Sequence, residues 1–220
     1  MAAIAAALFD WDGTLIDSRD ALLAAWREST GQVLGRPYPA SQAEEDVVFT
    51  LPGAQIWPEL ARDEDELAAL PEAFQESYSR NHHKVHAFPG VRELLAGLHS
   101  AGVRVAVVTS KSRRRFEPDA EQAGIREAID VAVCNEDVDA PKPDPAPVLC
   151  ALERLELPAD RTVMVGDTPV DVASGLGAGT PVIGVTWGHY GEAELREAGA
   201  VAVVDSPAEL LDLALDRAAA

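Results

Sequence analysis

The chain has 220 residues, of which 47% are hydrophobic and 25% are charged, a balance typical of globular proteins and not of disordered or fibrous ones. Its 37 acidic against 18 basic residues give a formal net charge of −19, which disfavours nucleic-acid binding because counterion release needs clustered Lys and Arg. No run approaches the roughly 18 apolar residues that cross a bilayer. We therefore expect a soluble, cytoplasmic protein with no membrane partner.

Short apolar runs alternate with helical stretches along most of the chain. The first run, Ile4 to Phe9, has the length of a strand that is covered on both faces. Five later runs are also expected to be strands, the last of them at an edge: Val103 to Val108, Asp130 to Cys134, Thr162 to Val165, Pro181 to Val185 and Ala200 to Val204. This alternation predicts an α/β fold, a doubly wound parallel (Rossmann-like) sheet with helices on both faces.

Helices are expected between these strands, at Gly90 to Ser100, Ser112 to Ala123, Pro145 to Leu155 and Pro169 to Leu176. Gly102 follows the first of them where a C′ glycine belongs. Near the C-terminus, the segment from Ser206 to Glu209 has the form of a capping box with proline at N1. It predicts a last helix that extends to about Leu215.

The interval from Ile16 to His86 breaks the alternation, because it contains no convincing strand. Its amphipathic helical stretches lie at Ser18 to Thr30, Ser41 to Thr50, Pro52 to Ala61 and Asp63 to Arg80. We therefore expect a discontinuous α/β core, residues 1–15 and 87–220, and an inserted helical cap, residues 16–86. Such an insertion follows the carboxyl end of the first strand, where open α/β sheets bind ligands.

Four aspartates follow two of the strand runs, in Asp10-Trp11-Asp12-Gly13-Thr14 and in Gly166-Asp167-Thr168-Pro169-Val170-Asp171. Their carboxylates would project from neighbouring strand ends into one crevice. Like charges this close suppress each other's ionisation unless a cation holds them, and oxygen ligands favour Mg²⁺. The sequence therefore predicts a magnesium-dependent phosphoryl-transfer site.

The first of these motifs contains a candidate nucleophile and a candidate acid/base. A carboxylate such as that of Asp10 can form an aspartyl-phosphate, and Asp12 can protonate the leaving oxygen and later deprotonate water. Gly13 would let the chain leave the strand sharply, with its amide facing the phosphate. A lone Asp-x-Asp is more often a surface loop, but the strand before it and Gly13-Thr14 after it favour the functional interpretation.

The run ending in Thr109-Ser110-Lys111 places hydroxyls between a strand and a helix. The hydroxyls of Thr109 and Ser110 suit phosphate oxygens, helped by the helix dipole. Taken alone, a Ser or Thr before a helix is only an N-cap. Lys111 alone would be a solvated surface lysine.

Lys142 lies in a proline-stiffened loop, Pro141-Lys142-Pro143-Asp144-Pro145. It can neutralise both a transferring phosphoryl group and the Asp10 carboxylate, although a solvated loop lysine is an equal alternative. In the last motif Asp167 is expected to bind the metal ion, and Asp171, one helical turn later, to accept a hydrogen bond that orients Lys142. Either aspartate alone would read as a helix cap.

In this order the four elements resemble the haloacid dehalogenase superfamily of phosphohydrolases, over nearly the whole chain. The resemblance implies that Asp10 is the nucleophile and Asp12 the acid/base. It implies that Mg²⁺ is bound by the Asp10 side chain, the Asp12 main-chain carbonyl and Asp167. Thr109 and Lys142 would then bind phosphate.

The helical insertion resembles the C1 cap of that superfamily. Phe88-Pro89-Gly90-Val91, Val108-Thr109-Ser110-Lys111 and Gly184-Val185-Thr186-Trp187-Gly188 are similar to segments of phosphoglycolate phosphatases and their pyrophosphatase relatives. The resemblance implies a phosphatase that acts on a small phosphomonoester, a phosphorylated metabolite like phosphoglycolate. Trp11 and Ser110 depart from the residues common there, and both are expected to alter the pocket near the leaving group.

Several alternatives remain open. The acid at Asp12 disfavours dehalogenation, and the lack of a lysine between Ile16 and His83 disfavours phosphonate hydrolysis through a Schiff base. A phosphosugar mutase, a pyrophosphatase or a non-catalytic binding module fits the same motifs. The chain is compatible with a monomer or a homodimer, and His189 with a position at the pocket or on the surface.

Overall fold

Six parallel strands form the central sheet of the computed structural model, which describes residues 4–50 and 53–218. The strand order is β5-β4-β1-β6-β7-β8. Their bounds are β1 Ala6–Phe9, β4 Arg104–Val108, β5 Val131–Val133, β6 Thr162–Gly166, β7 Val182–Val185 and β8 Ala202–Val204. Each expected strand is present to within two residues at either end, and β8 lies at an edge as predicted.

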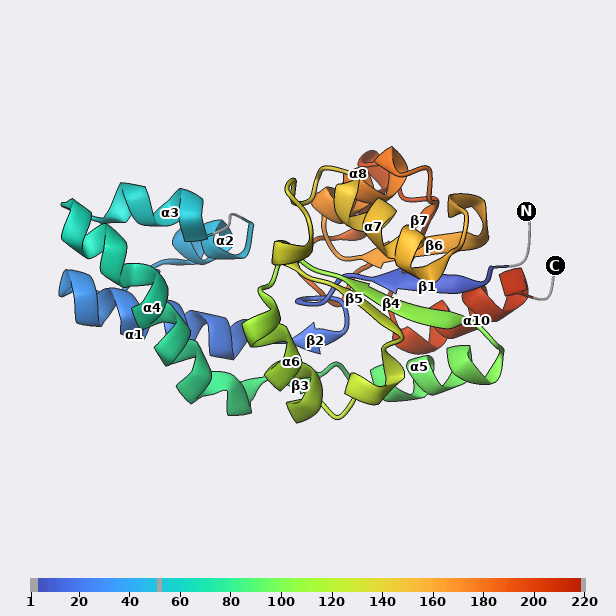
Figure 1. Cartoon of the computed structure of the whole chain (residues 1–220), viewed down its shortest axis with the longest axis horizontal. Coiled ribbons are helices and arrows are strands. Elements are labelled where there is room, and N and C mark those ends of the chain that lie inside the picture. Colours follow the sequence, from blue (N-terminus) through green and yellow to red (C-terminus); the bar gives the residue numbers. More distant parts are fainter. Residues whose placement is uncertain (1–3, 51–52, 219–220) are drawn as a thin grey trace. The chain divides into compact units, whose positions relative to one another are not determined.

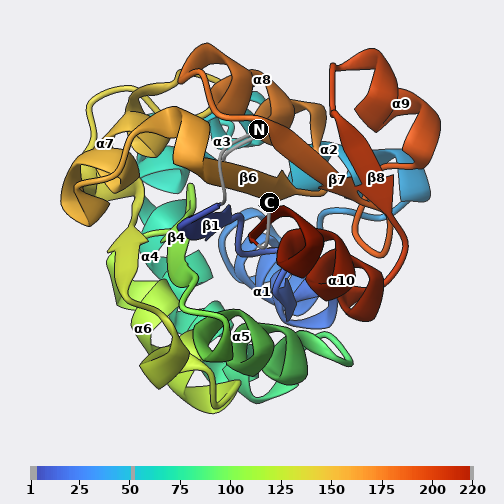
Figure 2. The same ribbon diagram turned by 90° about the vertical axis from the view of Figure 1, so that its right-hand side faces the viewer.

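Helices cover both faces of this sheet (Figure 2). On one side lie α5 Val91–Ser100, α6 Arg113–Gln122 and α10 Pro207–Ala218; on the other lie α7 Ala146–Leu155, α8 Pro169–Gly177 and α9 Glu192–Glu197. Short 3₁₀ turns lie at η2 Arg126–Ala128, η3 Asn135–Asp137 and η4 Ala159–Arg161. The doubly wound α/β architecture is confirmed, and α9 is the helix that the sequence did not predict.

The register of the central strands brings their carboxyl ends to one level. Phe9 in β1 is paired with Val107 in β4 on one side and with Val165 in β6 on the other. All four residues of β1 are buried, because helices cover the strand on both faces. The residues that follow these strand ends, among them Asp10 and Asp167, therefore leave the sheet at the same edge.

The end of α5 and the start of α10 have the capping residues that the sequence predicts, but only part of the predicted hydrogen bonds. Gly102, which follows α5, has the left-handed φ of 75° that a C′ glycine allows. At the start of α10, Ser206 Oγ accepts a hydrogen bond from the Glu209 amide at 3.3 Å. The Glu209 carboxylate, however, accepts from the amide of Asp205 and not from that of Ser206. Only half of the predicted capping box is therefore formed.

A small antiparallel sheet joins β2, Ile16–Asp17, to β3, His86–Ala87. The sequence predicted no strand in this interval, so the expectation is wrong at both of its ends. Each strand has two residues, which is too short to show an alternating apolar pattern. The pairing forms where the chain leaves the first unit and where it returns.

The chain divides into two units, Met1–Asp17 with His86–Ala220, and Ser18–Val85. The second unit is helical (Figure 1) and contains α1 Arg19–Leu34, α2 Gln42–Thr50, α3 Gly53–Leu60, α4 Glu64–Asn81 and η1 His82–Lys84. Pro52, the expected start of its third helix, lies outside the described residues. Among the helices of the described ranges, none is both long and apolar enough to cross a membrane.

Aromatic side chains form the centre of the helical unit. Trp26 lies with its ring centroid 5.4 Å from that of Phe74 and 5.9 Å from that of Trp57. Both Trp26 of α1 and Phe74 of α4 are buried. Phe49 is half-buried, and the Arg19 guanidinium lies over its ring, 4.6 Å from the ring centroid.

Candidate active site

A tight turn follows β1 and fixes the direction of the first motif. Asp10 continues the sheet, because its amide donates to the Val165 carbonyl at 2.9 Å. The chain then reverses, and the Gly13 amide donates to the Ile16 carbonyl at 2.9 Å. That amide is therefore engaged within the turn. This geometry does not favour the hydrogen bond from the Gly13 amide to phosphate that the sequence analysis expects.

Glycine is required at position 13 for two structural reasons. Its φ is +89°, a region that L side chains rarely adopt. A Cβ atom there would lie 2.3 Å from Asp167 Oδ2, and a Cβ at Gly188 would lie equally close to the same oxygen. Two glycines thus leave the room that the Asp167 carboxylate occupies.

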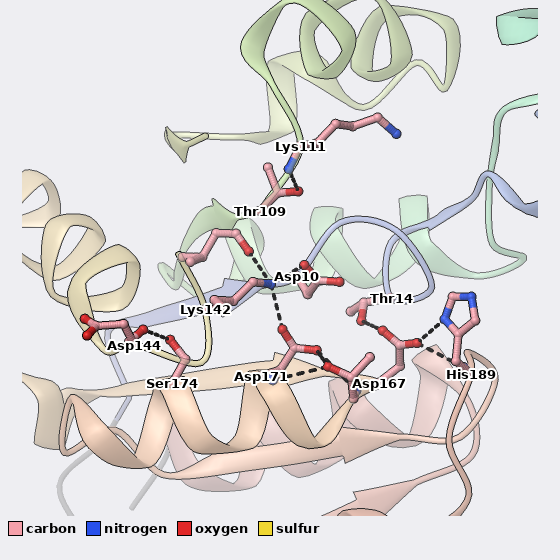
Figure 3. Close-up of polar contacts among 12 residues, drawn as sticks. Asp10, Thr14, Thr109, Lys111, Lys142, Asp144, Asp167, Asp171, Ser174 and His189 are labelled. Carbon is pink, nitrogen blue, oxygen red and sulfur yellow. Dashed lines mark hydrogen bonds and ion pairs between the residues drawn. The ribbon is translucent and has the colours of Figure 1, made fainter. Parts of the chain in front are cut away.

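Lys142 lies at the centre of the carboxylate cluster (Figure 3). Its Nζ atom donates to Asp10 Oδ1 at 2.5 Å, to Asp171 Oδ1 at 2.7 Å and to the Val108 carbonyl at 3.0 Å. Its side chain is only 5% exposed, so the solvated loop lysine is excluded. The contact with Asp171 is the one that the sequence analysis expects.

The loop that carries Lys142 is attached to α8. Ser174 Oγ donates to the Asp144 carbonyl at 2.8 Å (Figure 3). The Asp144 carboxylate accepts from the Ala146 amide at 2.8 Å. The second of these bonds closes the turn into α7. Two residues after Lys142, the backbone is therefore fixed by a side chain of the helix that also supplies Asp171.

Asp171 has partners on both carboxylate oxygens. Oδ1 accepts from Lys142, while Oδ2 accepts from the Thr168 hydroxyl at 2.6 Å and from the Thr168 amide at 3.2 Å. Thr168 Oγ1 in turn accepts from the Asp171 amide, which completes a capping box at the start of α8. Asp171 is thus both a helix-capping residue and the acceptor that orients Lys142.

Asp167 is held by residues that the motif analysis gave little weight. The Thr14 hydroxyl donates to Oδ1 at 2.9 Å, and the His189 amide donates to Oδ2 at 2.9 Å. His189 Nδ1 also lies 2.7 Å from Oδ2, so His189 belongs to the site and not to the outer surface (Figure 3). The Trp187 indole N–H donates to the Thr14 carbonyl at 2.9 Å and ties the two loops together.

The charges in this cluster oppose one another. Burial, with the nearby Asp171 and Asp167 carboxylates, raises the pKa of Asp10 to about 8, although Lys142 acts in the other direction. Burial alone would lower the pKa of Lys142, but the carboxylates of Asp10 and Asp171 raise it above its ordinary value. Burial likewise disfavours the charged form of His189, yet the hydrogen bond to Asp167 and its charge raise the pKa of the imidazole.

The donor set fits a hard divalent cation. Carboxylate oxygens of Asp10, Asp167 and Asp171, all buried, lie within 4.8 Å of one another. Against these three carboxylates stands the ammonium of Lys142, so the cluster has a formal excess of negative charge that a divalent ion would balance. Asp167 and Asp171 each accept hydrogen bonds on both carboxylate oxygens, whereas among the described residues Asp10 accepts a hydrogen bond on Oδ1 alone.

The hydroxyl motif divides into buried and exposed residues. Thr109 is buried, and its Oγ1 accepts from the Lys111 amide at 3.0 Å. Ser110 is exposed, and no hydrogen bond among the described residues joins its side chain to the cluster. Lys111 is not the solvated lysine that the sequence suggested, because its side chain is 2% exposed. Its Nζ atom lies 2.7 Å from Asp12 Oδ1 and 2.8 Å from Asp119 Oδ2.

Trp11 does not line a pocket. The side chain is fully buried and packs edge-on against Phe116 of α6, with ring centroids 4.8 Å apart. The expectation that this tryptophan alters the pocket near the leaving group is therefore wrong, because Trp11 packs in the core. Its ring joins the turn after β1 to α6.

A family model, curated relatives and solved structures each match most of this chain. Residues 7–185 match the family model described as haloacid dehalogenase-like hydrolase. The N-acetylmuramic acid 6-phosphate phosphatase of Pseudomonas aeruginosa is 36% identical over 218 residues, which cover 97% of this chain and 95% of that protein. The phosphoglycolate phosphatase of Pseudomonas fluorescens is 30% identical over 220 residues, which cover 96% and 80%. A crystal structure of a predicted phosphoglycolate phosphatase from Haemophilus somnus matches with a TM-score of 0.84, 25% identity and coverage of 97% and 99%.

Proposed function

Because this chain belongs to the haloacid dehalogenase-like hydrolase family and is a phosphoric monoester hydrolase, we propose that it cleaves a small phosphomonoester through an aspartyl-phosphate on Asp10 in a magnesium-dependent reaction. One observation carries the proposal. Lys142, almost inaccessible to solvent, donates to both Asp10 and Asp171, beside a third buried carboxylate from Asp167. Burying such a cluster is costly unless it binds a cation, either alone or together with an anionic substrate.

Asp10 is the nucleophile in this proposal. Lys142 holds its Oδ1, and among the described residues no hydrogen bond reaches Oδ2, which is therefore the oxygen available for attack on phosphorus. As the new P–O bond forms, the bond to the leaving oxygen breaks and Asp12 supplies its proton. Asp12 then removes a proton from the water that attacks the phosphorus of the aspartyl-phosphate, which restores the Asp10 carboxylate.

Mg²⁺ would be held by the side chains of Asp10 and Asp167 with the main-chain carbonyl of Asp12. When bound, the ion supplies positive charge to the phosphoryl oxygens and to the clustered carboxylates. Lys142 and Thr109 are proposed to bind phosphate oxygens. Thr14 and His189 orient Asp167 through the hydrogen bonds they donate.

The substrate is proposed to be a small phosphorylated metabolite, with phosphoglycolate as the first candidate. A sugar 6-phosphate is the second, because the relative at 36% identity is named for an N-acetylmuramic acid 6-phosphate. The helical unit, Ser18–Val85, is proposed to be the cap that presents the side chains which select between them. Its buried Trp26 and Phe74 are used in its own core, so selectivity must come from other residues of the unit.

Steady-state phosphate release tests the proposal. The panel contains phosphoglycolate, sugar phosphates, nucleoside monophosphates, pyrophosphate and an aryl phosphate, each with Mg²⁺ and with a chelator. We expect Mg²⁺-dependent release, with one small phosphomonoester preferred. Conversion of a sugar phosphate to its isomer without phosphate release would indicate a mutase, and preference for pyrophosphate would indicate a pyrophosphatase. The absence of release from every compound, the aryl phosphate included, would overturn the phosphatase assignment.

A further inference from the structure

Lys111 is a buried charged residue that the proposed chemistry leaves without a role. It lies two residues after Thr109, and its side chain is directed away from Lys142 (Figure 3). Its Nζ atom contacts Asp12 Oδ1 at 2.7 Å and Asp119 Oδ2 at 2.8 Å. Lys111 thus belongs to a second ion-pair cluster beside the one around Asp10.

The three members of this second cluster differ in exposure. The side chains of Lys111 and Asp119 are 2% and 0% exposed, whereas that of Asp12 is 27% exposed. Asp12 is therefore the member that an arriving substrate and an attacking water can reach. Behind it, Lys111 is enclosed and has few alternative positions for its ammonium group.

Helix α6 fixes this arrangement from the far side. Asp119 lies one helical turn after Phe116, so both are on the same face of α6. Phe116 packs against Trp11, the residue between the two aspartates of the first motif, and Asp119 holds Lys111. One face of α6 thus determines the positions of the Trp11 ring and of the ammonium that contacts Asp12.

Resting on the proposed function, we propose that Lys111 is a positioning residue that holds the Asp12 carboxyl group in the orientation needed for proton transfer. A small misplacement of a catalytic group can cost about 10²-fold in rate, so a buried ammonium that contacts the Asp12 carboxyl group bears directly on proton transfer. With Oδ1 fixed by Lys111, the carboxyl group is directed for both steps that Asp12 performs. Asp119 acts through Lys111, because it anchors the ammonium from the opposite side.

The experiment compares Lys111→Met with the parent protein, using the Mg²⁺-bound enzyme. For kcat/KM, which reports the step in which the leaving oxygen departs, we expect a loss of about 10- to 100-fold with an alkyl phosphate. An aryl phosphate with a good leaving group needs little proton transfer, so its kcat/KM should fall far less. Equal losses for the two substrates would overturn the proposal.

A double-mutant cycle tests whether Lys111 acts through Asp12. If it does, Asp12→Asn and the Asp12→Asn, Lys111→Met double variant should have the same kcat/KM, because nothing is left to position. Losses that multiply would contradict the proposal. The matched control is Arg113→Met, which removes the ion pairs with Asp137 and Glu117 at the start of the same helix. Any loss of kcat/KM in Arg113→Met should be the same for the alkyl phosphate and the aryl phosphate.

Lys111→Met leaves the Asp119 carboxylate buried without its ammonium partner, so the single variant is at risk of misfolding. The Lys111→Met, Asp119→Leu variant removes both buried charges and supports the same measurement. We expect it to show the same leaving-group dependence, and a uniform loss would overturn the proposal. Failure of the phosphatase assignment is distinguishable, because the parent protein would then release no phosphate from either substrate.

Discussion

The Nζ atom of Lys142 lies 2.5 Å from Oδ1 of Asp10, in a site where the two side chains are 5% and 11% exposed. The same ammonium also bonds Asp171 and the Val108 carbonyl, so its three donors are all engaged. Lys142 therefore stabilises the fold of the site as well as being proposed to bind phosphate. Removing it would leave two carboxylates buried together.

We expect Lys142→Met to lower the free energy of unfolding by about 3–5 kcal/mol, because it breaks a buried ion pair and leaves the carboxylates without their counter-charge. Urea denaturation in the absence of Mg²⁺ measures this loss. The control is Lys84→Met, at a half-exposed lysine of the helical unit, which should change stability by no more than about 0.5 kcal/mol. Equal stability of the two variants would contradict the structural role of Lys142.

Asp10→Asn should raise the Tm of the metal-free protein at alkaline pH. The folded protein raises the pKa of Asp10 to about 8, against about 3.9 in an unfolded chain. Because the folded state binds this proton more tightly, the carboxyl group lowers stability as pH rises from about 4 to about 8. Over these roughly three pH units the loss amounts to roughly 3–4 kcal/mol. The Tm difference between variant and parent should therefore widen by roughly 7–15 °C between about pH 5 and pH 8, since about 1 kcal/mol moves Tm by roughly 2–4 °C in a chain of this size.

Scanning calorimetry in the presence of a chelator measures this difference. Asp139→Asn, at an exposed aspartate, provides a control with the same change of charge outside the site. A Tm difference for Asp10→Asn that stays constant across this pH range would show that the folded protein does not raise the pKa of Asp10.

Mg²⁺ affinity should rise with pH. Below about pH 8 the Asp10 carboxyl group of the metal-free protein retains its proton, and the proton must leave before the oxygen can bind a cation. The apparent Kd for Mg²⁺ should thus fall by up to about tenfold per pH unit between about pH 6 and pH 8 and then level off. Isothermal titration calorimetry at constant ionic strength gives the Kd and the number of protons released. A Kd that does not change with pH would refute this coupling.

Gly13→Ala should weaken Mg²⁺ binding by an order of magnitude or more, because its Cβ would lie 2.3 Å from Asp167 Oδ2. Gly102→Ala is the matched control: its φ of 75° is also left-handed, but nothing lies within 4 Å of a Cβ there. Both variants should lose roughly 1–2 kcal/mol of stability from backbone strain. Only Gly13→Ala should lose Mg²⁺-dependent stabilisation in thermal denaturation, and an equal Mg²⁺ response of the two would contradict the role of Gly13.

The strand runs and their following motifs were predictable because buried strands of a parallel sheet are continuous apolar stretches. Ile4 to Phe9 marks β1 for this reason, and the polar Asp10 marks its end. Once β1 and β6 are identified, their parallel pairing brings Asp10 and Asp167 to one edge of the sheet. The short strands β2 and β3 were not predictable, because two residues carry no periodicity.

Two residues could not be placed from the sequence for a different reason: the sequence leaves the position of His189 open and suggests a solvated lysine at Lys111. Lys111 has a partner 99 positions earlier in Asp12, and His189 has one 22 positions earlier in Asp167. Neither pairing leaves a local pattern, and a lysine in a polar stretch is usually exposed. The signal that was present is the scarcity of lysine: of the three in the chain, two are buried against carboxylates.

The central claim is that Asp10 becomes phosphorylated during turnover. The direct measurement is peptide mass spectrometry on enzyme that has been acid-quenched during steady-state turnover of the preferred substrate with Mg²⁺, using Asp12→Asn to slow hydrolysis of the intermediate. We predict one phosphoryl group on Asp10, absent without Mg²⁺ and absent in Asp10→Asn. Turnover with no phosphorylated peptide, or with the phosphoryl group on another residue, would contradict the account.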